Sequence, residues 1–146
     1  MICAVHEINE MRKVLEYFRS DLPSLRSGAV MIPDFAEKVA QFGNLCVFRE
    51  DSLLKGFAVY YANDRETLTG YLSMIAVKPS CQNAHIGSRL LAYVEKQATL
   101  KGMHTVKLEV SKENLSAISF YEHHGYHRCG EKPQSYYYEK YMEEGR

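Results

Sequence analysis

A carboxylate and a phenol in the second half of the chain have the chemistry to move a proton between two reactants. Glu109 falls in 104–110, a segment that alternates apolar and polar residues as a strand does. A carboxylate in such a strand needs water, a partner or a cationic substrate, because burying it alone costs free energy. Tyr121 falls in the helical segment 116–124, where its hydroxyl could donate a proton or its ring could pack beside Phe120. The sequence therefore offers one candidate base and one candidate acid.

A polar loop between a buried strand and a helix is suited to bind an anion. The strand-like segment 67–77 is followed by Pro79, and an amphipathic helix is predicted over 87–101. The first-turn amides of a helix have no intrahelical partner, so with the loop amides they form a site for a phosphate. Arg89 opposes the helix dipole in that first turn, which suits a nearby bound anion. The alternative is an ordinary connection between a strand and a helix.

The elements that position these residues follow from the period of the apolar residues. Strands are expected over 2–8, 45–49, 53–61, 67–77, 104–110, 126–129 and 136–142, and helices over 9–20, 34–42, 87–101 and 116–124. We expect Asn9 to cap the first helix and Asp21-Leu22-Pro23 to end it. Short polar turns make the early strands antiparallel neighbours, whereas the helix over 87–101 makes the strands on either side of it parallel.

The expected fold is therefore α/β, with a mixed, mostly antiparallel sheet of about seven strands, a central parallel β-α-β crossover and about four helices. A chain of 146 residues without repeats or a linker-like stretch predicts a single domain over residues 1–146.

The two functional segments resemble the GNAT superfamily of acetyltransferases. The coenzyme-A loop of that family is (Gln/Arg)-x-x-Gly-x-(Gly/Ala), and this chain has Gln82-Asn83-Ala84-His85-Ile86-Gly87, with His85 where the family has glycine. Histidine enters the left-handed backbone region more readily than most residues, so the loop can still form. The family's strand-Asn-helix-Tyr-x-x-x-Gly-(Phe/Tyr) motif is matched at Asn114, Ala117, Tyr121, Gly125 and Tyr126. The resemblance covers residues 71–129 closely.

The resemblance implies that acetyl-CoA is bound as a co-substrate where two parallel strands diverge, with no metal. The backbone of the first strand would bind the pantetheine arm, and the loop amides would bind the pyrophosphate. The residues expected to contact acetyl-CoA are Ile75, Ala76, Val77, Gln82, Asn83, Ala84, His85, Ile86, Gly87, Ser88, Asn114 and Tyr121.

The resemblance also implies N-acetyltransferase activity, with direct transfer to a primary amine of a small molecule or of a protein or peptide. Tyr121 would be the general acid for the departing sulfur, and Glu109 would be a general base acting through a water molecule. The alternative for Glu109 is an ion pair with Lys107 or Lys112. The alternative function is a catalytically inactive module that binds or senses acyl-CoA.

Composition excludes several other classes. The 18 basic residues balance the 18 acidic ones, so no net charge attracts the protein to nucleic acid. The sequence has neither a signal-peptide pattern nor an apolar run of the ~20 residues that a membrane helix needs. We therefore expect a cytoplasmic protein without a nucleic-acid or membrane partner, and the sequence leaves open whether it forms a homodimer.

The cysteines and histidines give little support to a metal site. The four cysteines are far apart and form no CxxC pair, which argues against a zinc ribbon and a redox motif. His123, His124, His127 and Cys129 are close together in the sequence, but their spacing fits no common zinc pattern.

Overall fold

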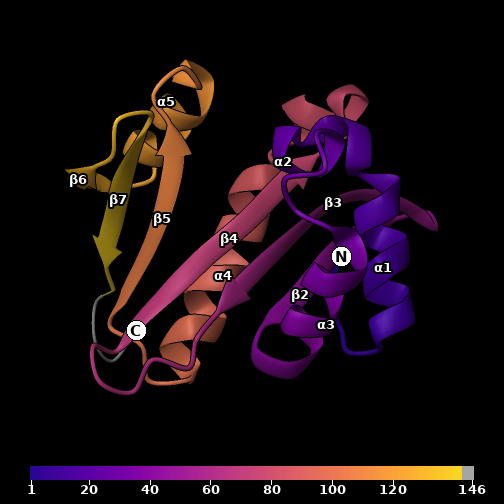
Figure 1. Cartoon of the computed structure of the whole chain (residues 1–146), viewed down its shortest axis with the longest axis horizontal. Coiled ribbons are helices and arrows are strands. Elements are labelled where there is room, and N and C mark those ends of the chain that lie inside the picture. Colours follow the sequence, from indigo (N-terminus) through magenta and orange to yellow (C-terminus); the bar gives the residue numbers. More distant parts are fainter. Residues whose placement is uncertain (143–146) are drawn as a thin grey trace. The chain divides into compact units, whose positions relative to one another are not determined.

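Seven strands form one mixed sheet in the computed structural model, which describes residues 1–142 apart from the side chains of Asn83 and Ala84 (Figure 1). The strands are β1 (Ile2–Val5), β2 (Asn44–Glu50), β3 (Leu53–Tyr61), β4 (Thr69–Val77), β5 (Thr105–Ser111), β6 (His127–Glu131) and β7 (Ser135–Tyr141), and their order is β1-β2-β3-β4-β5-β7-β6. The helices are α1 (Ile8–Tyr17), α2 (Pro23–Arg26), α3 (Ile32–Phe42), α4 (Ile86–Leu100) and α5 (Leu115–His123), with 3-10 turns η1 (Arg19–Asp21) and η2 (Pro79–Ala84).

The strand directions confirm the predicted fold class. β4 and β5 are parallel and are connected through α4, whereas β1–β2, β2–β3, β5–β7 and β6–β7 pair antiparallel. The sheet is therefore mixed and mostly antiparallel, with one β-α-β crossover.

The chain divides into two compact units, each built from two separated stretches. Unit 1 contains Met1–Tyr60 and Met74–Val94, and unit 2 contains Tyr61–Ser73 and Glu95–Arg146. Both β4 and α4 contribute residues to each unit, so neither unit is a continuous segment. The single domain expected over residues 1–146 remains a prediction.

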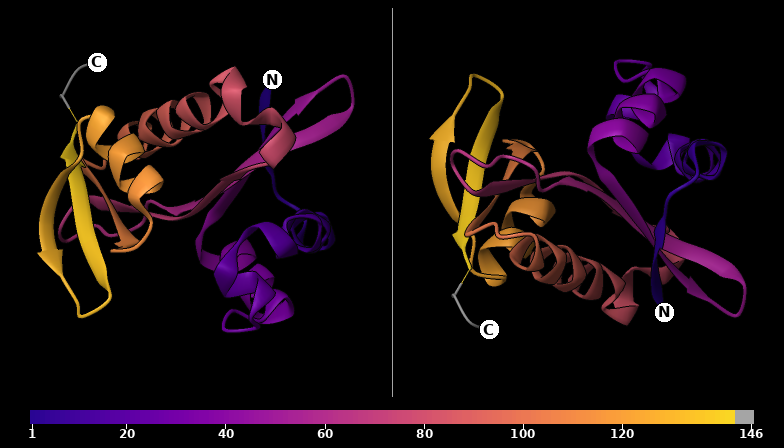
Figure 2. Two further views of the ribbon diagram at one scale, coloured as in Figure 1. Left: turned by 90° about the horizontal axis from the view of Figure 1, so that it is seen from above. Right: turned by 90° about the horizontal axis from the view of Figure 1, so that it is seen from below.

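In unit 1, helices cover both faces of the strands. Figure 2 shows α1 and α3 on one face and the first part of α4 on the other. On the first face, the rings of Phe18 and Phe57 have centroids 4.8 Å apart. On the second, a Cβ added at Gly56 would lie 3.0 Å from both the Ala76 carbonyl oxygen and Leu90 Cδ1. Glycine at position 56 therefore permits β4 and α4 to approach β3 closely.

In unit 2, α5 packs on one face of β5 and β7 (Figure 2). Leu108, Val110 and Tyr138 are buried on that face, and the Tyr138 hydroxyl donates a 2.7 Å hydrogen bond to Glu122 on α5. Side chains alternate along a strand, so Lys107, Glu109 and Tyr137 project from the opposite face. Tyr71 joins them because it pairs with Lys107 in the β4–β5 register. Tyr71, Lys107, Glu109 and Tyr137 therefore share one face of the sheet.

Two local predictions are wrong. The N-cap of α1 is Glu7 and not Asn9, because the Glu7 carboxylate accepts hydrogen bonds from the amides of Asn9 and Glu10. Pro23 does not simply end a helix: α1 ends at Tyr17, and Pro23 occupies the first turn of α2, where its missing N–H is not needed.

Candidate functional site

The loop that was expected to bind an anion connects β4 to α4 in unit 1. It is formed by η2 and His85, whose backbone adopts the left-handed conformation with φ 58° and ψ 23°. The Arg89 amide donates to the carbonyl of His85, the residue just before α4, so the amides of Ile86 and Gly87 precede this bond at the helix start. Backbone N–H groups at a helix start favour an anion.

Gln82 holds η2 against the end of β4. The Gln82 side-chain amide donates a 3.3 Å hydrogen bond to the Val77 carbonyl. The backbone of Asn83 and Ala84 belongs to η2, but their side chains lie outside the described part of the chain. Arg89 is exposed, and its guanidinium carbon lies 4.9 Å from the centroid of the Phe48 ring.

Lys78 attaches the beginning of this loop to the end of α1. Its ammonium donates to Oδ2 of Asp21 at 2.7 Å and to the Tyr17 carbonyl at 2.6 Å. The same nitrogen lies 4.0 Å from the centroid of the Tyr17 ring, a cation–π contact. This role could not be predicted from the sequence, because Lys78 and Asp21 are 57 positions apart and neither belongs to a motif.

Within unit 2, the first part of β4 pairs in parallel with β5, from Thr69↔Thr105 to Leu72↔Leu108. Ile75, Ala76 and Val77, the residues expected to bind pantetheine, form the end of β4 in unit 1.

Glu109 has two partners in unit 2. Ser135 Oγ donates a 2.6 Å hydrogen bond to its Oε2, and Lys132 Nζ lies 3.5 Å from its Oε1. The ion pair expected with Lys107 or Lys112 is wrong for both lysines. Lys112 pairs with Glu131, and Lys107 lies over the Tyr137 ring.

Tyr121 is buried in unit 2, and its ring packs against two aromatic neighbours. The ring centroids of Phe120 and Tyr126 lie 5.4 Å and 5.9 Å from its own, both in edge-on geometry. Tyr126 is itself held by a 2.8 Å hydrogen bond from its hydroxyl to Glu95. Burial raises the pKa of Tyr121 to about 12, so its hydroxyl is protonated at neutral pH. This is the state that a proton donor requires.

Asn114 caps α5. Its side-chain oxygen accepts a 3.2 Å hydrogen bond from the Ala117 amide. Capping of the helix is by itself a sufficient reason for an asparagine at this position of the motif. The expected contact of Asn114 with coenzyme A remains a prediction.

Within residues 1–142, no three His, Cys, Asp or Glu side chains gather where they could hold a metal ion. One ring nitrogen of His124 lies 2.7 Å from the Phe120 carbonyl oxygen. In the same part of the chain, no helix is long and apolar enough to cross a membrane.

Known proteins resemble this chain in sequence pattern and in fold. A family model described as the acetyltransferase (GNAT) family matches residues 11–126. No curated protein matches the chain in sequence. The chain is similar in structure to an acetyltransferase of the GNAT family from Streptococcus pneumoniae, with a TM-score of 0.77 and 20% identity over 98% of this chain and 99% of that one.

Two further solved structures are similar. PaiA N-acetyltransferase from Thermoplasma acidophilum, solved in complex with coenzyme A, has a TM-score of 0.72 and 18% identity over 97% of this chain and 99% of that one. Nourseothricin acetyltransferase has a TM-score of 0.65 and 22% identity over 69% of this chain and 66% of that one. At these identities the likeness concerns the fold.

Proposed function

Because the chain belongs to the acetyltransferase (GNAT) family, we propose that it transfers an acetyl group from acetyl-CoA directly to a primary amine. The amine belongs to a small molecule or to a protein or peptide. Its nitrogen forms a bond to the acetyl carbonyl carbon, the carbon–sulfur bond breaks, and coenzyme A leaves as a thiol. The nitrogen loses a proton and the sulfur gains one, so the transfer needs a base and an acid.

The observation that carries the donor side of the proposal is the left-handed His85 directly before α4. Glycine reaches this conformation without strain, and histidine at position 85 adopts it, which supports a loop of the family's kind despite the histidine. We assign the pyrophosphate to the amides of residues 82–88, and the pantetheine arm to the backbone of Ile75, Ala76 and Val77. The extended backbone of these three residues at the end of β4 supports this assignment, because it can pair with a ligand that lies beside it as another strand would.

We assign the general acid to Tyr121 and the general base to Glu109. The pKa of about 12 keeps the Tyr121 hydroxyl protonated over the whole neutral range. This pKa exceeds the ~8.5 of a free thiol, so the first contribution of the phenol is a hydrogen bond to the sulfur as negative charge develops there. Glu109 has one oxygen fixed by Ser135, and the other can accept the amine's proton, directly or through a water molecule.

Replacement of Tyr121 by Phe tests the proposal. We expect release of the coenzyme-A thiol with an accepted amine to fall about 100-fold or more, while the dissociation constant of acetyl-CoA changes less than about threefold. Tyr60→Phe is the matched control, because it also removes the hydroxyl of a tyrosine that is 5% exposed. Wild-type protein that binds acetyl-CoA but transfers to no amine would instead indicate the sensing module.

A further inference from the structure

The carboxylate of Glu109 has one oxygen fixed by the fold and one that faces a cation. Ser135, which is 8% exposed, donates to Oε2 at 2.6 Å. The opposite oxygen, Oε1, lies 3.5 Å from Lys132 Nζ, and the two side chains are 32% and 53% exposed. Solvent therefore reaches both the carboxylate and the ammonium that neutralises it.

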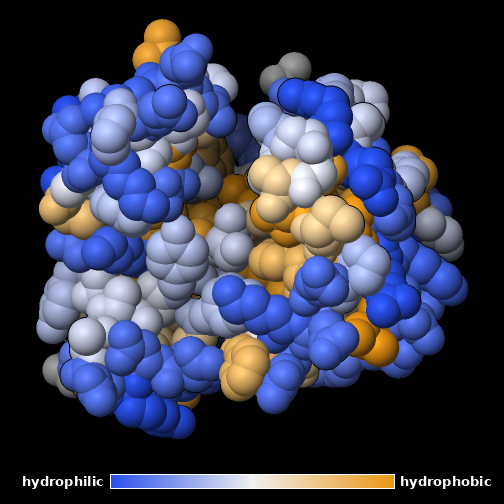
Figure 3. Space-filling view, viewed as in Figure 1, coloured by the Kyte–Doolittle hydropathy of each residue, from blue (hydrophilic) through white to orange (hydrophobic). Residues whose placement is uncertain are grey.

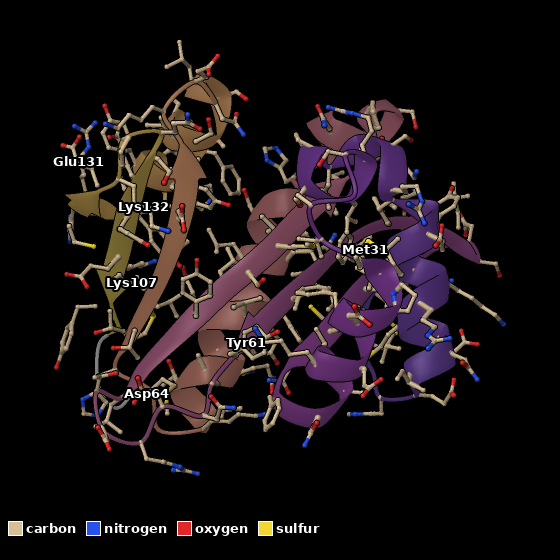
Figure 4. The ribbon with its side chains drawn as sticks, viewed as in Figure 1. Met31, Tyr61, Asp64, Lys107, Glu131 and Lys132 are labelled. Carbon is tan, nitrogen blue, oxygen red and sulfur yellow. The ribbon has the colours of Figure 1, made fainter. Side chains whose placement is uncertain are left out.

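An aromatic ring lies beside the same carboxylate. Tyr137 pairs with Glu109 in the β5–β7 register, and its ring centroid is 5.5 Å from Lys132 Nζ and 5.0 Å from Lys107 Nζ. Figure 4 shows Lys107 and Lys132 on the β5–β7 part of the chain, and Figure 3 shows that surface to be mostly hydrophilic. A carboxylate and the face of a tyrosine ring are the two groups that recognise an alkylammonium ion.

We propose that the acceptor binds at Glu109 as a primary alkylammonium ion. The Lys132 ammonium occupies this same position in the structure, and it therefore competes with the acceptor. The acceptor then binds as an ammonium ion, whose nitrogen loses two protons in the transfer. The first passes to the Glu109 carboxylate and from there to solvent, which frees the nitrogen lone pair and restores the carboxylate. The second leaves the nitrogen as it attacks, while the departing sulfur gains one. The inference rests on the proposed function and narrows its substrate to unbranched alkylamines such as the end of a lysine side chain or of a diamine.

The strength of the ion pair between Glu109 and Lys132 determines how much Lys132 weakens the binding of the acceptor. Lys132 follows β6 in the β6–β7 connection and is half exposed, and such surface ion pairs are weak. An acceptor therefore displaces Lys132 at a cost of about two- to fivefold in affinity.

The experiment compares Lys132→Met with Lys112→Met in the full chain. Lys112 is the matched control, because it also pairs with a carboxylate, Glu131, and lies 5.0 Å from a tyrosine ring centroid, that of Tyr136. Binding of n-butylammonium chloride is followed by the backbone amide NMR signals of β5 and β7, which needs no turnover. The Michaelis constant for n-butylamine is measured in parallel, and aniline, which is uncharged at neutral pH, is the comparison ligand.

We expect Lys132→Met to tighten n-butylammonium binding and to lower its Michaelis constant about two- to fivefold, with no gain for aniline. Lys132→Arg should behave as wild type, Lys112→Met should change nothing, and Glu109→Gln should abolish the shifts. Unchanged or weaker binding in Lys132→Met, or an equal gain for aniline, would overturn the proposal. A tightened cation site in a protein that transfers acetyl to no amine would refute the proposed function and leave the cation site standing.

Discussion

Ser135 on β7 donates a 2.6 Å hydrogen bond to Oε2 of Glu109 on β5. The two residues are diagonal neighbours, because Glu109 is opposite Tyr137 and Ser111 is opposite Ser135 in the antiparallel register. Ser135 is buried, so little water competes for the bond. The register of two strands thus fixes the orientation of the candidate base.

Replacing Glu109 by Gln should lower kcat about 100-fold, because the amide cannot accept the proton of the amine. Ser135→Ala should lower kcat about three- to tenfold, since the carboxylate loses its fixed orientation but remains present. Steady-state kinetics with an accepted amine measures both. Glu131→Gln, which removes a carboxylate of the same hairpin that pairs with Lys112, should leave kcat within about twofold. Equal activity of Glu109→Gln and wild type would remove Glu109 from the mechanism.

His85→Gly should raise the free energy of unfolding by about 0.5–1 kcal/mol, because glycine adopts the φ of 58° without steric strain. The affinity for acetyl-CoA should stay the same or rise. His85→Val should lower both quantities, because a β-branched residue is strained in the left-handed region. Urea unfolding and calorimetry measure the two effects, and a glycine variant that is less stable than wild type would contradict the account.

Lys78→Met should lower the free energy of unfolding by about 1–3 kcal/mol, since it leaves Asp21 and the Tyr17 carbonyl without their donor. The Lys78 and Asp21 side chains are only 20% and 16% exposed. Lys13→Met is the control, because its pair with Glu10 is 75% and 50% exposed and should contribute less than about 0.5 kcal/mol. Equal effects of the two substitutions in urea unfolding would show that Lys78 does not hold the loop to α1.

Stability should fall as the pH rises from about 9 to 12. Burial raises the pKa of the Cys46 thiol to about 12, from its ordinary value near 9. The unfolded chain therefore loses this proton first, and each such group contributes a slope of about 1.4 kcal/mol per pH unit between its two pKa values. Cys46→Ala should flatten the decline between pH 9 and 11, whereas Cys3→Ala, at an exposed position, should not. Parallel declines in all three proteins would contradict this origin.

The fold could be predicted from local patterns because each element carries its own signal. The apolar runs 45–49 and 53–61, with a short polar turn between them, predict the β2–β3 hairpin that the structure contains. The N-cap of α1 was harder to predict, because both Glu7 and Asn9 carry a side-chain oxygen that can accept hydrogen bonds from first-turn amides. The backbone conformation at the start of the helix determines which of the two residues is the cap.

Candidate site residues could be named from the sequence where they belong to a motif or where a strand carries an unusual carboxylate. Tyr121 and His85 stand in the two motifs, and Glu109 is a carboxylate within a strand; their roles in binding and catalysis remain predictions. Ser135 and Lys132 were missed because they meet Glu109 only through the register of β5 and β7, across 26 and 23 positions of the chain. Sequence patterns specify which face of a strand a side chain occupies. They do not specify which residues of a neighbouring strand or turn lie beside that side chain.

The most direct test of the proposed function is a calorimetric titration of acetyl-CoA into the wild-type protein and into a variant whose residues 82–87 are replaced by a neutral linker. We predict micromolar binding to the wild type and no measurable binding to a folded linker variant, because the amides before the α4 ladder would hold the pyrophosphate. No binding to the wild type, or equal binding to both proteins, would contradict the assignment of the donor site.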